Sequence, residues 1–176
     1  MLELIFPTRI LPVNLITTLE NQQVELNDTI LDIPINTKCI NLKVEDIFDF
    51  NQKTNNSGFT KQFINQNKGN IPVYSASQDE YFVNYGYVKD NLPGVKYFEI
   101  SLTWNIDGSV GKAFYRKGRF SLSEKVIPLI FRKEWNQLID FNYIKYKLEE
   151  KAIERGFGFS NKAGKSRISD IEIEIP

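Results

Sequence analysis

The sequence predicts a mixed α+β domain with a strand-rich twisted sheet or half-barrel, one long helix and polar loops. Aromatic residues make up 13% of the chain and are mostly Phe and Tyr, which are enriched in strands. Short apolar or alternating runs recur after residue 40 and are separated by Gly, Pro and Asn turn signals. Only residues 135–155 repeat apolar side chains at spacings of three and four, which indicates a single long helix.

The first forty residues have a different pattern. Their apolar residues show no sustained period and prolines interrupt them, although residues 17–26 are compatible with a short helix and Asn27 and Asp28 with a turn. We therefore interpret residues 1–40 as an N-terminal arm or connector, and residues 41–176 as the main domain.

The main domain is predicted to begin with a strand. Residues 42–50 fit a strand that leads into one helical turn, and residues 51–58 are typical of a polar surface loop. Residues 60–70 are predicted as a short helix or a loop that ends at a glycine. Residues 71–77 indicate a second strand, which runs into a polar loop.

Two glycine-containing turns organise the central part of the chain. We expect a strand over residues 95–104, a turn at residues 107–108 and then an alternating strand. A second turn is predicted at residues 117–118, and an apolar run over residues 126–131 indicates a buried strand. These strands would pair as β-hairpins.

The last part of the main domain combines the long helix with a final strand. The helix is predicted over residues 135–155, with Gly156 at the position where helices commonly end. Residues 157–167 are expected to form a loop, and residues 168–176 alternate as a strand does. The predicted buried stripe of the helix consists of Leu138, Phe141, Ile144, Leu148 and Ala152.

The composition argues against several kinds of catalytic site. The chain has no histidine and a single cysteine, Cys39, which nearly excludes zinc sites and Cys/His nucleophiles. No glycine-rich phosphate-binding motif has the required spacing. Glu149, Glu150 and Lys151 are the residue types of a metal-dependent nuclease, but we expect them on the solvent side of the helix. We therefore expect no catalytic residue, no cofactor and no metal site.

The sequence does not indicate a membrane protein. No window approaches the roughly 18 uninterrupted apolar residues that a spanning helix needs. The N-terminus lacks the features of a signal peptide, and the single cysteine fits a reducing compartment. We expect a cytoplasmic chain that makes no membrane contact.

Charge is distributed unevenly along a chain whose formal net charge is zero. Residues 1–50 carry three basic and eight acidic side chains, whereas residues 51–176 carry 19 basic and 14 acidic ones. This asymmetry is weak support for a part that faces nucleic acid. An ordinary solvated surface is the alternative that charge alone favours.

Four polar loops combine basic side chains, which suit phosphates, with side chains that can read base edges. They fall at residues 60–70, 75–78, 105–119 and 160–167, and a solvated loop is the alternative for each. The candidate basic contacts are Lys61, Lys112, Arg116, Lys117, Arg119, Lys162, Lys165 and Arg167. The candidate base-reading residues are Gln62, Ser77, Gln78, Asn105, Ser109 and Asn161.

The order of three short motifs resembles a known family. Residues 69–72 (Gly-Asn-Ile-Pro), 108–111 (Gly-Ser-Val-Gly) and 173–176 (Ile-Glu-Ile-Pro) follow one another as in the type I restriction enzyme DNA specificity domain family. The members of this family are the target-recognition domains of specificity subunits. The resemblance covers roughly residues 42–176, and the order and spacing of the motifs carry it.

The resemblance implies a recognition domain without catalytic activity, which reads half of a bipartite double-stranded DNA target through the major groove. It implies partners as well: an adenine methyltransferase (modification) subunit and a restriction subunit, or the same functions fused in one chain of a type II enzyme. A specificity subunit normally has two such domains, whereas this chain has one. A fragment, a half-subunit that forms a homodimer and the C-terminal part of a fused enzyme all fit that departure.

Two other classes of protein remain as alternatives from the sequence. A non-catalytic β-rich module could bind protein or carbohydrate through Tyr74, Tyr81, Tyr85 and Trp104, if these side chains are exposed. A small carboxylate-dependent hydrolase is the third class.

Overall fold

The computed structural model describes residues 39–176. The expectations for the N-terminal arm, including the short helix at residues 17–26 and the turn at Asn27 and Asp28, fall on residues outside that range. Within that range, Leu42–Ile173 forms one compact unit, which holds the six-stranded sheet and the helices that are described below.

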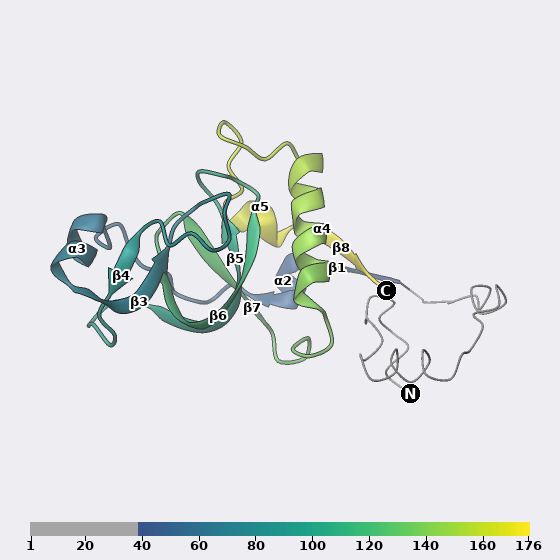
Figure 1. The fold of residues 1–176 in the computed structure, drawn as a ribbon. Coiled ribbons are helices and arrows are strands. Elements are labelled where there is room, and N and C mark those ends of the chain that lie inside the picture. Colours follow the sequence, from purple (N-terminus) through teal and green to yellow (C-terminus); the bar gives the residue numbers. More distant parts are fainter. Residues whose placement is uncertain (1–38) are drawn as a thin grey trace, which may run out of the picture. The chain divides into compact units, whose positions relative to one another are not determined.

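A six-stranded mixed sheet forms the centre of this unit (Figure 1). Strands β3 and β6 pair in parallel, and all other neighbours in the sheet are antiparallel. The sheet is open, with β2 and β4 at its edges, so the predicted α+β class with a strand-rich sheet is confirmed. In sheet order the strands are β2 (Phe48–Asp49), β7 (Val126–Phe131), β5 (Tyr97–Asn105), β6 (Ala113–Leu122), β3 (Lys68–Tyr74) and β4 (Gly86–Val88).

The strand and single helical turn predicted within residues 42–50 are confirmed. Strand β1 (Ile40–Lys43) leads directly into the single helical turn α2 (Val44–Ile47) and then into β2. The helical turn fits the core because its two apolar ends, Val44 and Ile47, are fully buried. Strand β1 pairs with the last strand of the chain, β8 (Glu172–Ile175), in a separate two-stranded sheet.

Strands β5 and β6 form the long hairpin at the centre of the sheet. Its turn contains Gly108 and Gly111, both with positive φ, which confirms the turn predicted at residues 107–108. The second turn, predicted at residues 117–118, is wrong because β6 continues through it. Gly118, with a φ of +90°, instead lies in a β-bulge where the register between β5 and β6 shifts.

The long helix α4 (Phe141–Glu154) begins later than predicted. The Asp140 side chain accepts hydrogen bonds from the backbone N–H groups of residues 142 and 143, and therefore caps the helix. Gln137, just before it, has a φ of +75°, which no helix accommodates. Leu138 consequently lies outside the helix and is 40% exposed, whereas Ile144, Leu148 and Ala152 form the buried stripe as predicted.

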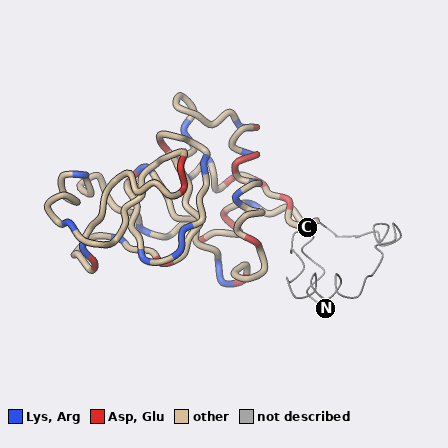
Figure 2. The backbone as a smooth tube through the Cα atoms, viewed as in Figure 1, with Lys and Arg blue, Asp and Glu red and all other residues tan. Residues whose placement is uncertain are grey.

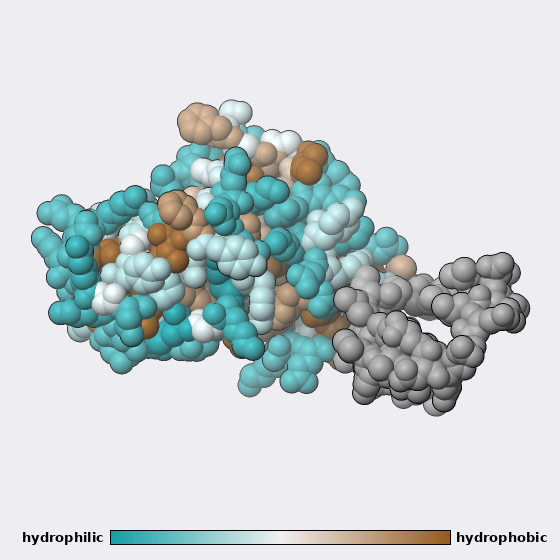
Figure 3. Space-filling view, in the orientation of Figure 1, coloured by the Kyte–Doolittle hydropathy of each residue, from teal (hydrophilic) through white to brown (hydrophobic). Residues whose placement is uncertain are grey.

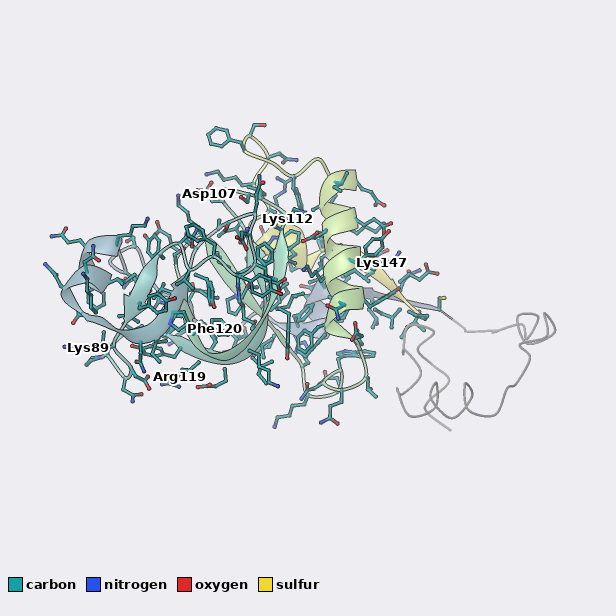
Figure 4. All side chains as sticks on the ribbon, viewed as in Figure 1. Lys89, Asp107, Lys112, Arg119, Phe120 and Lys147 are labelled. Atoms are coloured by element: carbon teal, nitrogen blue, oxygen red, sulfur yellow. The ribbon has the colours of Figure 1, made fainter. Side chains whose placement is uncertain are left out.

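Gly156 ends α4, and Glu149 attaches the helix to the sheet. Gly156 has a φ of +60° and its N–H donates to the carbonyl of Ile153, which confirms the predicted end of the helix. Contrary to the prediction, Glu149 does not face solvent. Its carboxylate accepts hydrogen bonds from the N–H of Ala113, at 3.0 Å, and from Nζ of Lys112, at 3.2 Å. These two bonds attach α4 to the start of β6, and Figure 4 shows Lys112 between the hairpin turn and the helix.

The final predicted strand is only partly correct. Its first residues form a short helix, α5 (Lys165–Ser169), and the strand β8 is confined to the end of the chain. The alternation was read correctly for Ile171, Ile173 and Ile175, which are 0%, 0% and 3% exposed. The segment before α5 is held to the sheet by Trp104, whose indole N–H donates to the carbonyl of Ala163.

None of the helices within residues 39–176 is long and apolar enough to cross a membrane. The same part of the chain contains no group of three or more side chains of the types His, Cys, Asp and Glu that could hold a metal ion.

Candidate nucleic-acid interface

Strands β3 and β4, at one edge of the sheet, belong to a small lobe with its own hydrophobic cluster. We define the α3 lobe as residues 51–74 and 86–97, which include β3, β4 and the short helix α3 (Lys61–Gln66). The hydroxyl of Thr60 accepts a hydrogen bond from the N–H of Phe63 and caps this helix. Helix α3 buries Ile64 in a cluster that also contains Phe59, Ile71, Val73 and Val88.

Gly69 brings the two strands of the lobe unusually close together. A Cβ at this position would lie 2.5 Å from the backbone N and Cα of Lys89, so a larger residue would push β4 away. The N–H of Lys89 donates to the carbonyl of Asn67, next to Lys68. The close approach therefore places Lys68 and Lys89 on neighbouring positions of the ladder, both exposed. It also gives a physical reason for the glycine in the Gly-Asn-Ile-Pro motif.

The α3 lobe is strongly basic. It contains a single acidic residue, Asp90, and this carboxylate is paired with Arg119 at 2.6 Å. No ion pair with another residue in the range 39–176 involves any of its lysines, although Lys61 lies 5.5 Å above the ring of Tyr85. Figure 2 shows these cations around α3, β3 and β4, and Figure 3 shows the same end of the fold as largely hydrophilic. The lysines are Lys53, Lys61, Lys68, Lys89 and Lys96.

By contrast, three of the cations predicted from the sequence are neutralised by neighbours. Lys112 pairs with Glu149 as described above, and Lys162 pairs with Asp107 at 3.0 Å. The hydrogen bond from Lys162 lowers the pKa of the Asp107 carboxyl. Arg119 forms ion pairs with Asp90 and with Glu99, both at 2.6 Å. Their charge is therefore already compensated within the domain.

Arg116 belongs to the core, contrary to the expectation that it lies at the surface. It is 6% exposed, and its guanidinium stacks 3.8 Å above the ring of Tyr74. One guanidinium nitrogen donates to the carbonyl of Glu80, and burial lowers the pKa of the group. Lys117, the next residue along β6, is exposed and remains available for a contact.

The C-terminal loop uses its polar side chains to hold its own shape. The Asn161 amide donates to the carbonyls of Arg155 and Gly156, at 3.0 and 2.8 Å. Arg167 donates to the side chain of Asn161, and Lys165 donates to the carbonyl of Phe50. These three candidates therefore link the loop to α4 and to the start of the domain.

Two hairpin loops are joined by Asn105, which was predicted as a base-reading residue. Its side chain is 1% exposed and donates to the carbonyls of Ser77 and Ser109, at 2.8 and 3.2 Å. Asn105 therefore cannot reach a base, which corrects the prediction. The Ser77 hydroxyl accepts from the N–H of residue 79, and Gln78 is exposed. The side chains of Gln78 and Gln62 thus remain accessible.

The structure adds candidate residues of the lobe that the sequence did not indicate. The outer face of α3 adds Asn65 and Gln66 to Lys61 and Gln62, and all four are exposed. The signal that could have found them is the absence of any acidic residue between 50 and 78. Asn55 was also missed, because the hub that its buried side chain forms with residues 96, 121 and 122 joins distant segments.

The aromatic platform of the alternative binding module does not form. Trp104 is fully buried, and Tyr74 lies beneath the Arg116 guanidinium. Tyr81 alone of the four is highly exposed, at 87%, and acidic residues 79 and 80 precede it. The fold therefore does not offer these side chains together to a sugar or a peptide.

The sequence is similar to those of two curated proteins. Two curated relatives from Mycoplasma pneumoniae, both named "Putative type I specificity subunit", are 28% identical over 139 residues and 29% identical over 119 residues. These matches cover 76% and 66% of this chain and 34% and 47% of the relatives, so the chain spans less than half the length of either.

Two solved structures share the fold. The S subunit of a type I restriction-modification system from M. genitalium matches with a TM-score of 0.58 and 17% identity, over 86% of this chain and 36% of that one. The HsdS subunit from Thermoanaerobacter tengcongensis matches with a TM-score of 0.56 and 12% identity, over 93% and 42%. The model of the type I restriction modification DNA specificity domain matches residues 38–176, and the chain belongs to that family.

Proposed function

We propose that this chain is a sequence-specific DNA-recognition module of a restriction-modification system and binds half of a bipartite double-stranded target. Family membership over residues 38–176 is the observation that carries the proposal. The domain makes no catalytic contribution of its own in this proposal. A second domain of the same kind, on the same subunit or on a second copy of this chain, reads the other half.

The α3 lobe supports a particular placement of the DNA. Phosphate contacts need exposed cations whose charge is not already compensated, and the lobe supplies Lys61, Lys68 and Lys89. Figure 4 shows Lys89 at the outer end of the fold. Most cations of the hairpin and the C-terminal loop are instead used within the domain. We therefore assign the main phosphate contacts to the α3 lobe.

We assign the modification and the cleavage of DNA to partner subunits. The relatives are named type I specificity subunits, so we propose a type I assembly in which a separate adenine methyltransferase subunit modifies the target and a restriction subunit cleaves DNA. The chain would hold these subunits on the correct sequence. Purification of the chain with the methyltransferase subunit encoded beside it tests this part, and two proteins that elute separately would contradict it.

Selection from a random duplex library at several salt concentrations tests the recognition itself. The chain together with its methyltransferase partner should enrich one sequence motif, with an affinity that falls as salt rises. Failure to enrich any motif at any salt concentration would overturn the proposed function.

A matched pair of charge variants tests the placement. Replacing Lys61, Lys68 and Lys89 with Gln should reduce the slope of log affinity against log salt by roughly 3, since each phosphate contact contributes about 0.9. The control replaces Lys117, Lys125 and Lys133, which are exposed and make no ion pair with any residue in the range 39–176. It removes the same charge and should leave most of the slope intact. Equal losses in the two variants would contradict the placement while leaving DNA recognition standing.

A further inference from the structure

The outer face of α3 presents three side-chain amides that the fold does not use. Gln62, Asn65 and Gln66 are exposed, and no hydrogen bond joins their side chains to another residue in the range 39–176. At 3.6 residues per turn, they lie with Lys61 within an arc of about 140°. Ile64 points the other way and is 1% exposed. The amides therefore form one polar face on a helix anchored from behind.

Several side-chain amides elsewhere in the domain bind the backbone. Asn84 donates to the carbonyl of Ala76 and accepts from the N–H of Ser75, and the side chains of Asn55, Asn105 and Asn161 also bind backbone groups. Removing the α3 amides would cost the fold no hydrogen bond to a described residue, and the same holds for isolated exposed amides such as Gln78. The α3 amides differ from these in that three of them share one face of a helix, which suits a ligand outside the domain.

The position of α3 is suitable for a nucleic-acid groove. The helix lies beyond the edge strand β4 and its outer face points away from the sheet (Figure 1). Its six residues span about 9 Å, and the major groove of B-DNA is about 12 Å wide. Lys61 lies on the helix, Lys68 follows it and Lys89 is next to Lys68 on the ladder, while the one carboxylate of the lobe, Asp90, is paired with Arg119. Phosphates on either side of a groove would therefore meet cations whose charge is not compensated by an ion pair to a described residue.

The helix is also held firmly enough to discriminate between bases. Thr60 caps its first turn, and the N–H of Asn67 donates to carbonyls of the last turn. The amide of Asn67 donates to the carbonyl of Phe63 as well, at 2.9 Å. With Ile64 fixed in the cluster below, the outer side chains start from a defined backbone, which base readout requires.

We propose that α3 is the base-reading helix of this domain and that Gln62, Asn65 and Gln66 recognise adenines in the major groove. The amide of Asn or Gln matches adenine because it can donate to N7 and accept from the N6 amino group at the same time. About 9 Å of helix covers roughly three base pairs at 3.4 Å each. The half-site therefore contains at least two A·T pairs within about three positions. This inference rests on the proposed DNA-recognition function.

Single substitutions in the chain with its methyltransferase partner test the inference. Gln62→Ala, Asn65→Ala and Gln66→Ala should each reduce discrimination at one A·T position by about tenfold to hundredfold, while the salt slope stays unchanged because no charge is lost. Gln62→Arg should shift the preference at its position from adenine to guanine. Gln78→Ala, an exposed amide outside the lobe, is the control and should leave the motif unchanged. Thermal unfolding should be the same for all of these variants.

The outcomes separate the inference from the function on which it rests. A wild-type motif without neighbouring A·T pairs, or a motif that none of the α3 substitutions alters, would overturn the assignment of α3 alone. Absence of any enriched motif for the wild-type protein would overturn the proposed function and the inference together. A loss of discrimination confined to Gln78→Ala would place base readout on the loop after β3 and would also overturn the assignment.

Discussion

Replacing Gly111 with alanine tests how closely the hairpin turn packs against α4. The backbone at Gly111 has a φ of +83°, and a Cβ there would lie 2.8 Å from the Cβ of Ala152. A left-handed backbone costs an L-residue about 1–2 kcal/mol, and an extra methyl group forced into a packed contact costs about 1–3 kcal/mol. We expect Gly111→Ala to lower the free energy of unfolding by about 2–5 kcal/mol.

Gly94 provides a matched control. Its φ is +82°, almost the same as at Gly111, but an added Cβ would meet no atom within 4 Å. Gly94→Ala should therefore show only the backbone cost of about 1–2 kcal/mol. Urea unfolding followed by tryptophan fluorescence and circular dichroism measures both free energies, and unchanged m-values would show that the two states are comparable.

A double-mutant cycle locates the contact. Ala152→Gly removes the atom that an alanine at 111 would meet, although glycine in a helix costs about 1 kcal/mol by itself. The two substitutions should be less harmful together than the sum of their single effects, by about 1 kcal/mol or more. Equal losses for the alanine variants of Gly111 and Gly94, or a coupling energy of zero, would refute the reasoning.

The other predictions concern single polar or charged side chains of the hairpin and of α4. Asn105→Ala should lower the free energy of unfolding by about 2 kcal/mol, because two loop carbonyls lose a buried donor. Arg116→Ala should cost a similar amount through its lost stacking and hydrogen bond, whereas Lys117→Ala should change the unfolding free energy by less than about 0.5 kcal/mol; equal effects would contradict the burial of the arginine. Asp140→Ala should cost about 1 kcal/mol and Asp140→Asn much less, since asparagine also caps helices, and urea unfolding checks both. The lowered pKa of Asp107 means that its carboxylate stabilises the fold above the pKa of the unfolded chain, and this stability is lost as the pH falls through the folded pKa. Asp107→Asn should accordingly weaken the dependence of stability on pH in the acid range, and an unchanged dependence would contradict the Lys162 hydrogen bond.

Local signals predicted the fold well wherever they agreed with tertiary packing. The hairpin turn and the end of α4 were correct because glycines there adopt the backbone conformations that glycine favours. The predicted start of α4 was wrong because Leu138 has the apolar spacing of the helix without belonging to it. The helix begins at Phe141, where the Asp140 side chain caps it. Gly118 was mistaken for a turn because a bulge and a turn require the same residue type, and only strand pairing distinguishes them.

The candidate site was harder to predict because charge does not reveal its own partners. Lys112 and Glu149 are 37 positions apart in the sequence, and only the docking of α4 makes them an ion pair. Arg116 lies in an alternating strand where side chains point to opposite faces, and a shift of one residue decides between core and surface. Lys61 and Gln62 lie on α3, a short helix that residues 60–70 indicate locally. The other lysines of the lobe depended on the pairing of β3 with β4.

The separate hydrophobic cluster of the α3 lobe has a consequence for how recognition can change. Phe59, Ile64 and their neighbours hold α3 from below, whereas the cluster at Phe98 and Phe120 belongs to the hairpin. Substitutions on the outer face of α3 touch neither cluster, so new combinations of side chains there carry little cost in stability. Under the proposed assignment of base reading to α3, a few surface substitutions would change the target while the sheet and α4 stay as they are.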